Sequence, residues 1–437
     1  MPPTKQIALE IFRKTLASID IASVMERKVQ LDHSRLVFPS TTVDLGQISR
    51  VIVIAIGKAA HAMAAGMVNC LPPTMCLEGI VAAPTKPASK IAGFAYFVGG
   101  HPIPNNESLR AAIEILRLLR TCDSSTLVMF LLSGGGSALV ELPVNPALSL
   151  EDIQEIHSVL VTCGAPIEAI NTVRRHLSAV KGGALAVVAG PARKITLAVT
   201  DVPVGHETAL ASGPSLPDPT TIVDVQRIFA QYDLLRRFPA SLQTWLANGL
   251  MPETPKPDHS AFDNNHFELL LGMDDLFHAA HHAVEAHGYV SFCDNSTDDW
   301  PVEKAAESLL SQLERWNRDN PGERVAVIAD GEVSCPVTGQ GVGGRNLAFV
   351  LACVEKIARR KITILSGGTD GIDGNSPAAG AVADGDTLSR ARSLGLDPRA
   401  SFVNSDAYSF FAKLDDAIIT GPTGNNLRDL RILLAEP

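Results

Sequence analysis

The sequence has few aromatic residues and no excess of positive charge. Only 5% of its 437 residues are Phe, Trp or Tyr, whereas 46% are hydrophobic. A chain with this composition is typical of an α/β protein with a large core, and its length predicts two domains. The formal net charge is −10, and we find no basic run longer than Arg359-Arg360-Lys361. We expect no nucleic-acid partner, because binding to the phosphate backbone usually needs a concentrated excess of Lys and Arg.

Long apolar runs and metal-binding cysteine patterns are also missing. No run approaches the roughly 18 to 20 apolar residues of a membrane span. Charged residues interrupt the first 25 positions, which lack the pattern of a signal peptide and are typical of an amphipathic helix. The seven cysteines form neither C-x-x-C nor a Cys/His ligand spacing, which disfavours a structural zinc site or disulfides. We therefore expect a cytoplasmic protein with reduced thiols and no membrane partner.

Short apolar runs alternate with segments of helical length along the whole chain. The apolar runs occupy residues 51–57, 79–84, 126–132, 194–202, 267–272, 289–294, 324–330, 361–367 and 416–421. Continuous apolar strands separated by helices predict an α/β fold with mostly parallel sheets covered on both faces. Three prolines and several polar residues interrupt this pattern between 248 and 265, where we place a domain boundary. The predicted domains are 1–250 and 260–437.

A glycine-rich segment follows the apolar run 126–132. Its glycines would let backbone N–H groups approach an anion, and the start of a helix would add the positive end of the helix dipole. The alternative is a tight turn with positive φ, which one glycine would satisfy. The segment is not a P-loop, because G-x-x-x-x-G-K-[ST] is absent. We predict that nucleotide phosphates bind at Ser133, Gly134, Gly135, Gly136 and Ser137.

Several cations occupy positions from which they could bind an anion. Lys58 follows the run 51–57 and could place its ammonium beside a helix N-terminus, although a surface lysine after a tight turn is the alternative. Arg174 and Lys181 lie seven positions apart, on nearly the same helix face, and could present to one anion. Spacing alone favours an exposed basic helix face for this pair. Arg345 begins a predicted helix and could hold a phosphoryl group with two hydrogen bonds.

Carboxylates stand near two of the predicted strand ends. Asp201 could coordinate Mg²⁺ or accept a hydroxyl proton, whereas an Asx-turn or helix cap is the alternative. Asp370 and Asp373 lie in the segment SGGTDGIDG (366–374). Acidic residues beside glycine-rich anion loops suit metal–nucleotide chemistry, since Mg²⁺ bridges phosphates to one or two carboxylates. We predict nucleotide contacts for the other residues of this loop, namely Gly367, Gly368 and Thr369.

One further pattern is a formal dinucleotide-binding fingerprint. Gly339, Gly341 and Gly344 form G-x-G-x-x-G before a predicted helix. The acidic residue expected about 20 positions later, at the end of the next strand, is missing, since that strand ends at Leu365-Ser366. We therefore discount dinucleotide binding at this segment.

Together these motifs resemble those of the glycerate 2-kinases, a family whose carboxyl-terminal half is called the MOFRL domain. The resemblance extends over nearly the whole chain. It rests on IGKAA (56–60), GGHPIPNNES (99–108), LLSGGGSAL (131–139), INTVRRHLSAVKGG (170–183), TDVPVG and ASGP (within 200–214), GGRN (343–346), SGGTDGIDG (366–374) and TGPTGNN (420–426).

The chain departs from the family pattern at two places. His206-Glu207 stand where the family pattern has an acidic pair, and Leu347-Ala348 stand where Gln-Glu usually continues the helix. These departures concern the metal and substrate geometry more than the fold. If the missing acid is a metal ligand, Glu207 is the residue that could replace it.

The resemblance implies a two-domain α/β enzyme with an active site in the cleft between the domains. It implies a Rossmann-like, mostly parallel N-terminal sheet and a second α/β domain. The implied reaction transfers the γ-phosphoryl group of ATP to the 2-hydroxyl of D-glycerate with Mg²⁺, giving 2-phosphoglycerate and ADP. The oligomeric state, for which a homodimer is one alternative, is not fixed by the sequence.

On this hypothesis the candidate residues divide into catalytic, substrate-binding and metal-binding groups. Lys58 and Arg345 would neutralise the transferring phosphoryl group, and Arg174 with Lys181 would hold the glycerate carboxylate. The catalytic and metal-binding acids would be Asp201, Asp370 and Asp373. Two alternatives remain: an NAD(P)H-dependent hydroxypyruvate reductase with His101 or His176 as proton donor, and a sensor that binds ligand without turnover.

Overall fold

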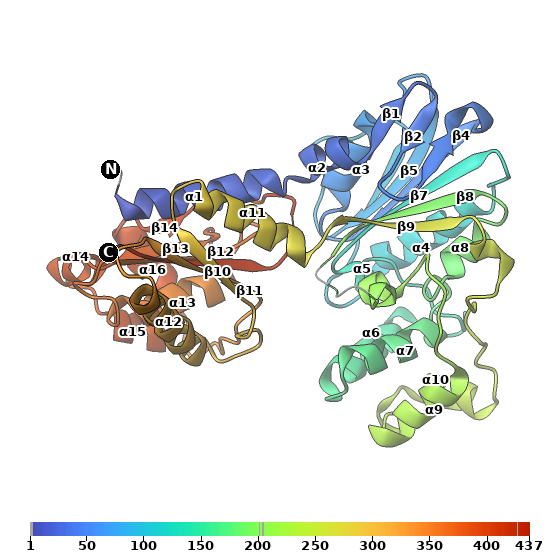
Figure 1. Cartoon of the computed structure of the whole chain (residues 1–437). Helices are drawn as coiled ribbons and strands as arrows, with labels where there is room; N and C mark the ends of the chain where they lie inside the picture. The colour runs from blue at the N-terminus through green and yellow to red at the C-terminus, as the bar shows by residue number, and fades with distance from the viewer. Residues whose placement is uncertain (1–2, 201, 203–204, 426) are drawn as a thin grey trace. The chain divides into compact units, whose positions relative to one another are not determined.

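The computed structural model describes residues 3–200, 202, 205–425 and 427–437 (Figure 1). Two compact units make up the chain. We call Ile21–Leu271 the parallel-sheet unit, and Met1–Asp20 together with Gly272–Pro437 the mixed-sheet unit. The predicted α/β class with two domains is confirmed, because each unit is built around its own six-stranded sheet.

The compact units differ from the predicted domains 1–250 and 260–437 in two respects. Helix α1 (Thr4–Ser18) belongs to the mixed-sheet unit, although it begins the chain. The break between the units follows Leu271 and not the proline-rich segment, because β9 (Asn265–Leu271) still pairs with β8 of the parallel sheet. Prolines interrupted the helical pattern there without ending the unit.

The large sheet of the parallel-sheet unit has the strand order β6-β5-β4-β7-β8-β9, and every neighbouring pair is parallel. Counted along the sheet, this is the 3-2-1-4-5-6 order of a Rossmann fold. Besides β9, the strands are β4 (Arg50–Ile56), β5 (Cys76–Ala83), β6 (Phe94–Val98), β7 (Thr126–Ser133) and β8 (Arg193–Val199). A small antiparallel sheet contains β1 (Gln30–Asp32), β2 (Arg35–Val37) and β3 (Thr42–Asp44).

Helices cover the parallel sheet because its strands are buried on both faces. Alternate residues of β4, namely Ile52, Ile54 and Ile56, pack with α4 (Asn106–Leu119) and α8 (Ala184–Val188) on one face. The other face carries α3 (Ala60–Asn69), next to α2 (Ile21–Lys28). A second apolar cluster joins the helices α6 (Leu150–Thr162), α7 (Ile167–Leu177), α9 (Ile222–Gln231) and α10 (Ala240–Ala247), which gather together in Figure 1.

The sheet of the mixed-sheet unit has the order β10-β11-β15-β12-β13-β14. Only β10 (Val290–Asp294) and β11 (Val325–Asp330) are parallel neighbours. The remaining strands pair antiparallel: β12 (Ile362–Gly368), β13 (Gly380–Asp384), β14 (Ala417–Ile418) and β15 (Asp429–Ala435). The prediction of a mostly parallel arrangement was therefore wrong for this sheet, because an apolar run reports burial on both faces and not strand direction.

Helices also cover both faces of the mixed sheet. One face packs against α12 (Val302–Asp319) and α13 (Arg345–Val354), and further helices follow at α14 (Thr387–Ser393), α15 (Pro398–Val403) and α16 (Ala407–Lys413). On the other face α1 lies beside α11 (Met273–Glu285), as Figure 1 shows in blue and yellow, although the parallel-sheet unit separates these helices in sequence. Within the described residues, no helix combines the length and apolar content that a membrane crossing requires.

Candidate functional site

The parallel sheet reverses its strand order between β4 and β7. Chain connections run outward from this point in both directions, and in sheets of this kind ligands bind here, beyond the carboxyl ends of the strands. The loop after β4 contains Lys58, and the loop after β7 contains the three glycines predicted to bind phosphate. The sequence therefore places both predicted anion loops at the position in the sheet where this fold binds ligands.

Direct hydrogen bonds hold these two loops together. The backbone N–H of Lys58 donates to the carbonyl of Gly134 at 2.9 Å, and that of Ala59 donates to Oγ of Ser133 at 3.0 Å. Gly57 has φ +133°, and a Cβ there would lie 2.6 Å from the carbonyl oxygen of Ser133. Ser133 is fully buried, so its hydroxyl fixes the loop geometry and does not reach a ligand.

The Lys58 side chain and the His101 ring lie on either side of Gly135. A Cβ on Gly135, which has φ +85°, would lie 2.9 Å from Cδ2 of His101 and 3.5 Å from Cγ of Lys58. Lys58 is exposed. Partial desolvation of the ring, and then the nearby Lys58 ammonium, lower the pKa of His101 below its ordinary value. At neutral pH the ring is therefore neutral beside a cation.

The third glycine and the following serine make different contacts. Gly136 is buried, and a Cβ on it would lie 2.6 Å from Cβ of Ala211, so its lack of a side chain serves packing. The short helix α5 (Gly136–Leu139) then places Ser137 Oγ 2.8 Å from Ser212 Oγ. The predicted phosphate loop is thus divided into two partly exposed residues, Gly134 and Gly135, and packed structure beyond them.

A chain of polar contacts runs from this loop to Arg174. Ser212 Oγ donates to Asn171 Oδ1 at 3.1 Å, and an Arg174 guanidinium nitrogen lies 3.5 Å from the same oxygen. Ala211 and Ser212 both have positive φ, which is uncommon for residues other than glycine. The strained segment places the Ser212 hydroxyl between the glycine loop and Arg174.

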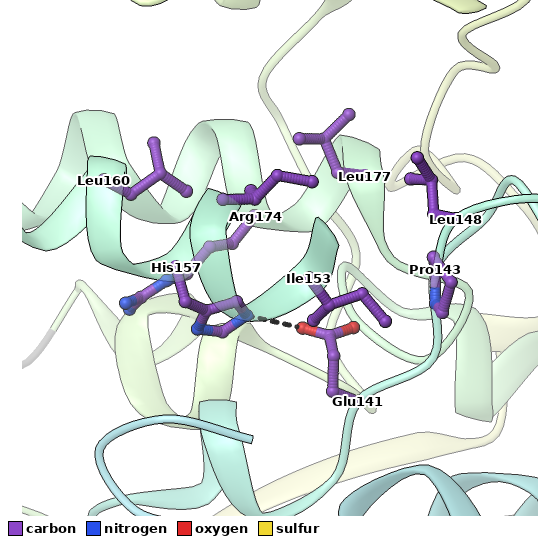
Figure 2. A pocket seen from close by; sticks show the side chains of 9 residues that line it. Glu141, Pro143, Leu148, Ile153, His157, Leu160, Arg174 and Leu177 are labelled. Carbon is purple, nitrogen blue, oxygen red and sulfur yellow. Dashed lines mark hydrogen bonds and ion pairs between the residues drawn. The ribbon is translucent and has the colours of Figure 1, made fainter. Parts of the chain in front are cut away.

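Arg174 is half-buried on α7, and burial lowers its pKa. Its Nε has no hydrogen-bond partner within the described part of the chain. The side chain lines a cavity of about 20 Å³, shown in Figure 2 with Glu141 and His157. A cavity of this size holds one water molecule. Arg174 Nε is therefore a buried donor, and the cavity that the side chain lines has room for one water molecule as its partner.

Lys181 does not join Arg174 in an exposed anion site. It is 2% exposed, and its ammonium lies 2.5 Å from Glu141 Oε2. His157 Nε2 contacts the same oxygen at 3.1 Å, as the dashed line in Figure 2 shows. The ion pair argues against the predicted binding of substrate by Lys181, because this buried carboxylate 40 positions earlier in the chain neutralises the ammonium.

The Glu141 carboxylate has a consequence for stability in acid. Burial alone would raise its pKa, but Lys181 and His157 together lower it from 4.5 to about 2. Because the folded-state pKa lies below the ordinary value, the contribution of Glu141 to stability is complete above about pH 4.5 and is lost as the pH falls towards 2. We expect the free energy of unfolding of Glu141→Gln, measured by urea titration, to fall less between pH 5 and 3 than that of the unaltered protein. An equal fall in both proteins would contradict this assignment.

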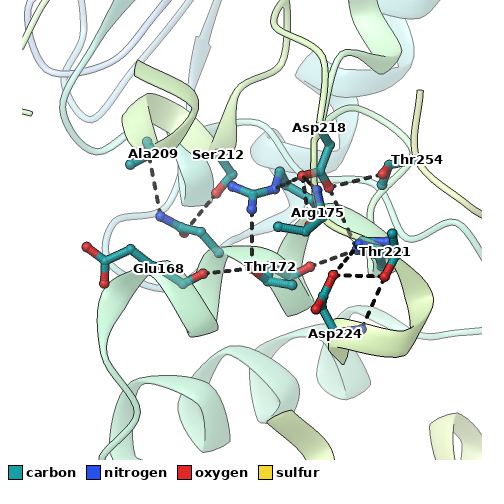
Figure 3. A network of polar contacts seen from close by, with 12 residues as sticks. Glu168, Thr172, Arg175, Ala209, Ser212, Asp218, Thr221, Asp224 and Thr254 are labelled. Carbon is teal, nitrogen blue, oxygen red and sulfur yellow. Dashed lines mark hydrogen bonds and ion pairs between the residues drawn. The ribbon is translucent and has the colours of Figure 1, made fainter. Parts of the chain in front are cut away.

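The cation that follows Arg174 is also structural. Arg175 is buried and pairs with Asp218 at 3.0 Å, and Asp218 accepts a hydrogen bond from Thr254. Figure 3 shows this network joining α7 to the segments that carry Asp218 and Thr254. Adjacent arginines on one helix thus face different surroundings, and only Arg174 lies beside the polar chain from the glycine loop.

In the mixed-sheet unit, Arg345 is bound by two carboxylates. Its Nε lies 2.5 Å from Asp429 Oδ2, and its NH1 lies 2.6 Å from Glu332 Oε2. Burial would lower the pKa of Arg345, but these carboxylates raise it above its ordinary value. The side chain of Asp429 is 4% exposed and that of Glu332 is 47% exposed. The predicted phosphoryl contact therefore requires an anion that takes the place of Glu332.

Asp373 caps helix α13, which differs from its predicted role as a metal ligand. One carboxylate oxygen accepts the backbone and side-chain N–H groups of Asn346 at 3.1 and 3.3 Å. The other accepts the backbone N–H of Leu347 at 2.8 Å. Burial raises the pKa of Asp373 to about 6 despite these hydrogen bonds. Both oxygens are occupied, so the metal-ligand prediction is not supported at this residue.

We expect Asp373→Ala to lower the free energy of unfolding by about 1–2 kcal/mol, the usual range for loss of a helix cap. The physical reason is that two N–H groups in the first turn of α13 lose their acceptor. Calorimetry on this variant and on Asp370→Ala, whose carboxylate is only half-buried, would measure the difference. Unchanged stability of Asp373→Ala together with an increased Mg²⁺ requirement would instead support a metal ligand.

The end of β12 and the first residues of the loop after it are largely buried. Gly367 packs against α1, since a Cβ on it would lie 2.7 Å from Cζ of Phe12. The Thr369 hydroxyl donates to the carbonyl of Arg428 at 2.8 Å and accepts from the backbone of Leu427. Gly367 and Thr369 thus have structural roles in place of the predicted nucleotide contacts. Gly368 lies beside Asp370 and stays a prediction.

The described residues do not form a metal cage by themselves. Within residues 3–200, 202, 205–425 and 427–437, no three His, Cys, Asp or Glu side chains lie so that they could hold a metal ion. The prediction for Asp201 falls outside the described residues. Asp370 accepts a backbone hydrogen bond from Ile372 at 3.0 Å and is half-buried. A single carboxylate of this kind suits Mg²⁺ that is bound mainly by phosphate oxygens.

The formal dinucleotide fingerprint has a structural explanation. A Cβ on Gly339 would lie 2.6 Å from Cα of Asn404, and one on Gly341 would lie 2.6 Å from Cα of Asp406. Both glycines let the loop approach the segment between α15 and α16. Their presence therefore does not indicate a site for pyrophosphate.

Comparison with known proteins identifies the family of the chain. Residues 7–247 match a domain of unknown function, DUF4147, and residues 325–429 match the MOFRL family. The chain is 32% identical over 431 residues to a D-glycerate 2-kinase of Thermotoga maritima, covering 98% of this chain and 97% of the relative. This chain belongs to the glycerate 2-kinase family with a MOFRL domain.

Other relatives of the chain carry the names glycerate 2-kinase, glycerate kinase and hydroxypyruvate reductase. A glycerate 2-kinase of Pyrococcus horikoshii is 30% identical over 434 residues, covering 98% of this chain and 97% of the relative. A crystal structure of glycerate kinase from Thermotoga maritima has a TM-score of 0.85 at 31% identity, covering 99% of each chain. An Agrobacterium vitis protein, 35% identical over 393 residues (88% of this chain and 87% of the relative), carries the provisional name hydroxypyruvate reductase.

Two sets of polar residues near the candidate site were not predicted from the sequence. Asn171 stands one helical turn before Arg174, a spacing that could have drawn attention to it. The role of Ser212 depends on a positive φ angle that no residue pattern in the sequence predicts. Glu332 and Asp429 likewise become recognisable as partners of Arg345 only when β11 and β15 are paired.

Proposed function

We propose that the chain transfers the γ-phosphoryl group of ATP to the 2-hydroxyl of D-glycerate, giving 2-phosphoglycerate and ADP. The observation that carries this proposal is similarity to a D-glycerate 2-kinase along 98% of the chain. The exposed cation and glycine backbone at the switch point of the parallel sheet support it, because phosphoryl transfer depends mainly on positioning and charge neutralisation.

In the parallel-sheet unit we assign the phosphate and the acceptor to different residues. Lys58 would contact the transferring phosphoryl group, while the amides of Gly134 and Gly135 would bind phosphate oxygens. Arg174 would hold the glycerate carboxylate. His101 is neutral at neutral pH and could therefore accept the proton of the attacking hydroxyl.

In the mixed-sheet unit we assign Arg345 to the phosphate chain, with Glu332 as the partner that a phosphate replaces. Asp429 would stay bound and keep the guanidinium oriented. Mg²⁺ would reach the protein with ATP and shield the phosphate charge. We assign Asp370 and Asp201 as protein ligands of this Mg²⁺. The roles proposed for the other residues do not require a site in which the protein alone holds the metal.

A coupled assay tests the function directly. We expect release of ADP that requires both D-glycerate and Mg²⁺. The ³¹P resonance of the product should be a doublet, because phosphate on carbon 2 couples to one proton, whereas phosphate on carbon 3 couples to two. Absence of D-glycerate-dependent ADP release would refute the kinase assignment, and a triplet would refute phosphorylation at carbon 2.

The same preparation separates the kinase from a reductase. Hydroxypyruvate reduction needs a proton donor, and the lowered pKa of His101 makes it a poor one at neutral pH. The glycines of the formal dinucleotide fingerprint are explained by packing. We therefore expect no oxidation of NADH or NADPH by hydroxypyruvate.

A further inference from the structure

A pocket of about 750 Å³ lies within the mixed-sheet unit. It opens at the carboxyl ends of β11 and β12, which are parallel to each other because β15 pairs antiparallel with both. The loops after these strands, the first turn of α13, and parts of α12 and α15 surround it. Ligands of α/β sheets bind at this edge, and the volume is within the range of small-molecule sites.

One side of the pocket is apolar and is held by packed helices. Val302 of α12, Val333, Pro336, Ala348 of α13 and Phe402 of α15 line it. The helices α12 and α15 are joined by an ion pair of 2.9 Å between Glu303 and Arg399, whose guanidinium also lies over the Phe402 ring. An apolar wall with a partly exposed aromatic ring suits a planar heterocycle.

The loop that closes this wall is fixed before any ligand binds. The backbone N–H of Thr338 donates to Ser405 Oγ at 3.0 Å, and its hydroxyl donates to the carbonyl of Val403 at 2.8 Å. The close approach of Gly339 and Gly341 to the 404–406 segment fixes the same loop. A preformed wall lowers the ordering cost of binding.

Charged residues also line the pocket. Arg345, Asp370 and Asp373 line it, and Arg345 is bonded to Asp429. The lining residues include one cation, Arg345, and three carboxylates, those of Glu303, Asp370 and Asp373. A triphosphate placed deep in the pocket would meet repulsion, whereas an uncharged group would not.

We propose that this pocket binds the adenine and ribose of ATP, with the phosphate chain directed towards Arg345. The inference rests on ATP being the phosphoryl donor of the proposed function. A three-carbon hydroxy acid would fill only a small part of this volume and would leave the apolar wall in contact with water. A nucleoside fills the apolar side and keeps the charged phosphates at the side where Arg345 lies.

The first test places a larger side chain on the apolar wall of the pocket. Ala348→Phe places a ring in the pocket, while Ala352→Phe makes the same change one turn along α13, outside the lining. We expect Ala348→Phe to raise KM for ATP at least tenfold and leave KM for D-glycerate within twofold. Ala352→Phe should change neither. A raised KM for D-glycerate with an unchanged KM for ATP would overturn the proposal.

Adenosine, which carries no phosphate, provides a test that does not depend on turnover. Calorimetry should show adenosine binding to the unaltered protein, at least tenfold weaker binding to Ala348→Phe, and unchanged binding to Ala352→Phe. Inorganic triphosphate should bind Ala348→Phe as it binds the unaltered protein. Absence of adenosine binding to the unaltered protein would overturn the inference, even where D-glycerate-dependent ADP release upholds the kinase.

A second variant guards against misfolding of Ala348→Phe. Phe402→Ala removes the half-buried ring from the wall and should also weaken adenosine binding. Photolabelling with 8-azidoadenosine should modify peptides from 333–348 or 398–407, and ATP should prevent it. Labelling confined to the parallel-sheet unit would place the nucleoside elsewhere and refute the proposal.

Discussion

Lys58→Ala is expected to lower kcat/KM by about a hundredfold to a thousandfold, the range for loss of one group that stabilises transition-state charge. Lys58 is exposed, and its backbone rather than its side chain joins the loops after β4 and β7. The variant should therefore keep its fold. Steady-state kinetics with varied ATP and D-glycerate would measure the loss.

The His101 ring supplies an independent readout for the same variant. The Lys58 ammonium disfavours the protonated ring, so its removal should raise the pKa of His101, although desolvation keeps it below the ordinary value. NMR titration of the ring protons would follow this change. Lys86→Ala, an exposed lysine elsewhere in the parallel-sheet unit, is the matched control. Near-normal turnover in Lys58→Ala would rule out its proposed role.

Lys58 gives a cleaner test of charge neutralisation than Arg345. Removal of Arg345 would leave the carboxylate of Asp429, which is 4% exposed, without its principal cation. Activity and stability would then change together. Arg345→Lys would retain the positive charge but lose the contact made through two nitrogen atoms, whereas Arg345→Ala would lose both.

Lys181→Met is expected to destabilise the parallel-sheet unit by about 3–5 kcal/mol, because it leaves the buried Glu141 without its cation. Methionine preserves the approximate length of the side chain and creates no large cavity. Urea unfolding followed by the fluorescence of Trp245, which lies in this unit, would measure the change. The altered protein should show an unchanged KM for D-glycerate wherever it remains folded.

The double variant Lys181→Met/Glu141→Gln separates the loss of the ion pair from altered packing. With both charges removed, no uncompensated ion is buried, so much of the stability should return. A Lys181→Met protein of normal stability but raised KM for D-glycerate would restore the substrate-binding role that the buried ion pair argues against.

The sequence predicted nine strands for a physical reason, although no predicted apolar run covers β6, β13 or β15. Each of the nine apolar runs overlaps a strand, because burial on both faces leaves a continuous apolar segment between polar loops. The parallel direction of the strands in the first sheet could also be expected from the alternation with helices, whereas its Rossmann-like character was implied by the family resemblance. The antiparallel position of β15 between β11 and β12 could not, since strand direction leaves no trace in the apolar pattern.

The candidate site was less predictable because partners lie far apart in sequence. Helical spacing placed Arg174 and Lys181 on similar faces, but only the fold reveals that Glu141 neutralises Lys181. Asp373 was predicted to bind metal because it stands among glycines, whereas it caps a helix that begins 28 residues earlier. Lys58 and Gly135 were easier, since their position follows from the strands that precede them.

The packing of α1 also constrains how the protein is made. Its residue Phe12 packs against Gly367, so α1 finds this partner only after the intervening residues have been translated. Residues 21–271 are, in chain order, an insertion into the mixed-sheet unit, and they emerge as one uninterrupted segment that can fold during translation. Until then the apolar face of α1, which includes Ile7 and Ile11, lacks the residues against which it packs. The mixed-sheet unit is therefore completed only after residues 272–437 have been synthesised.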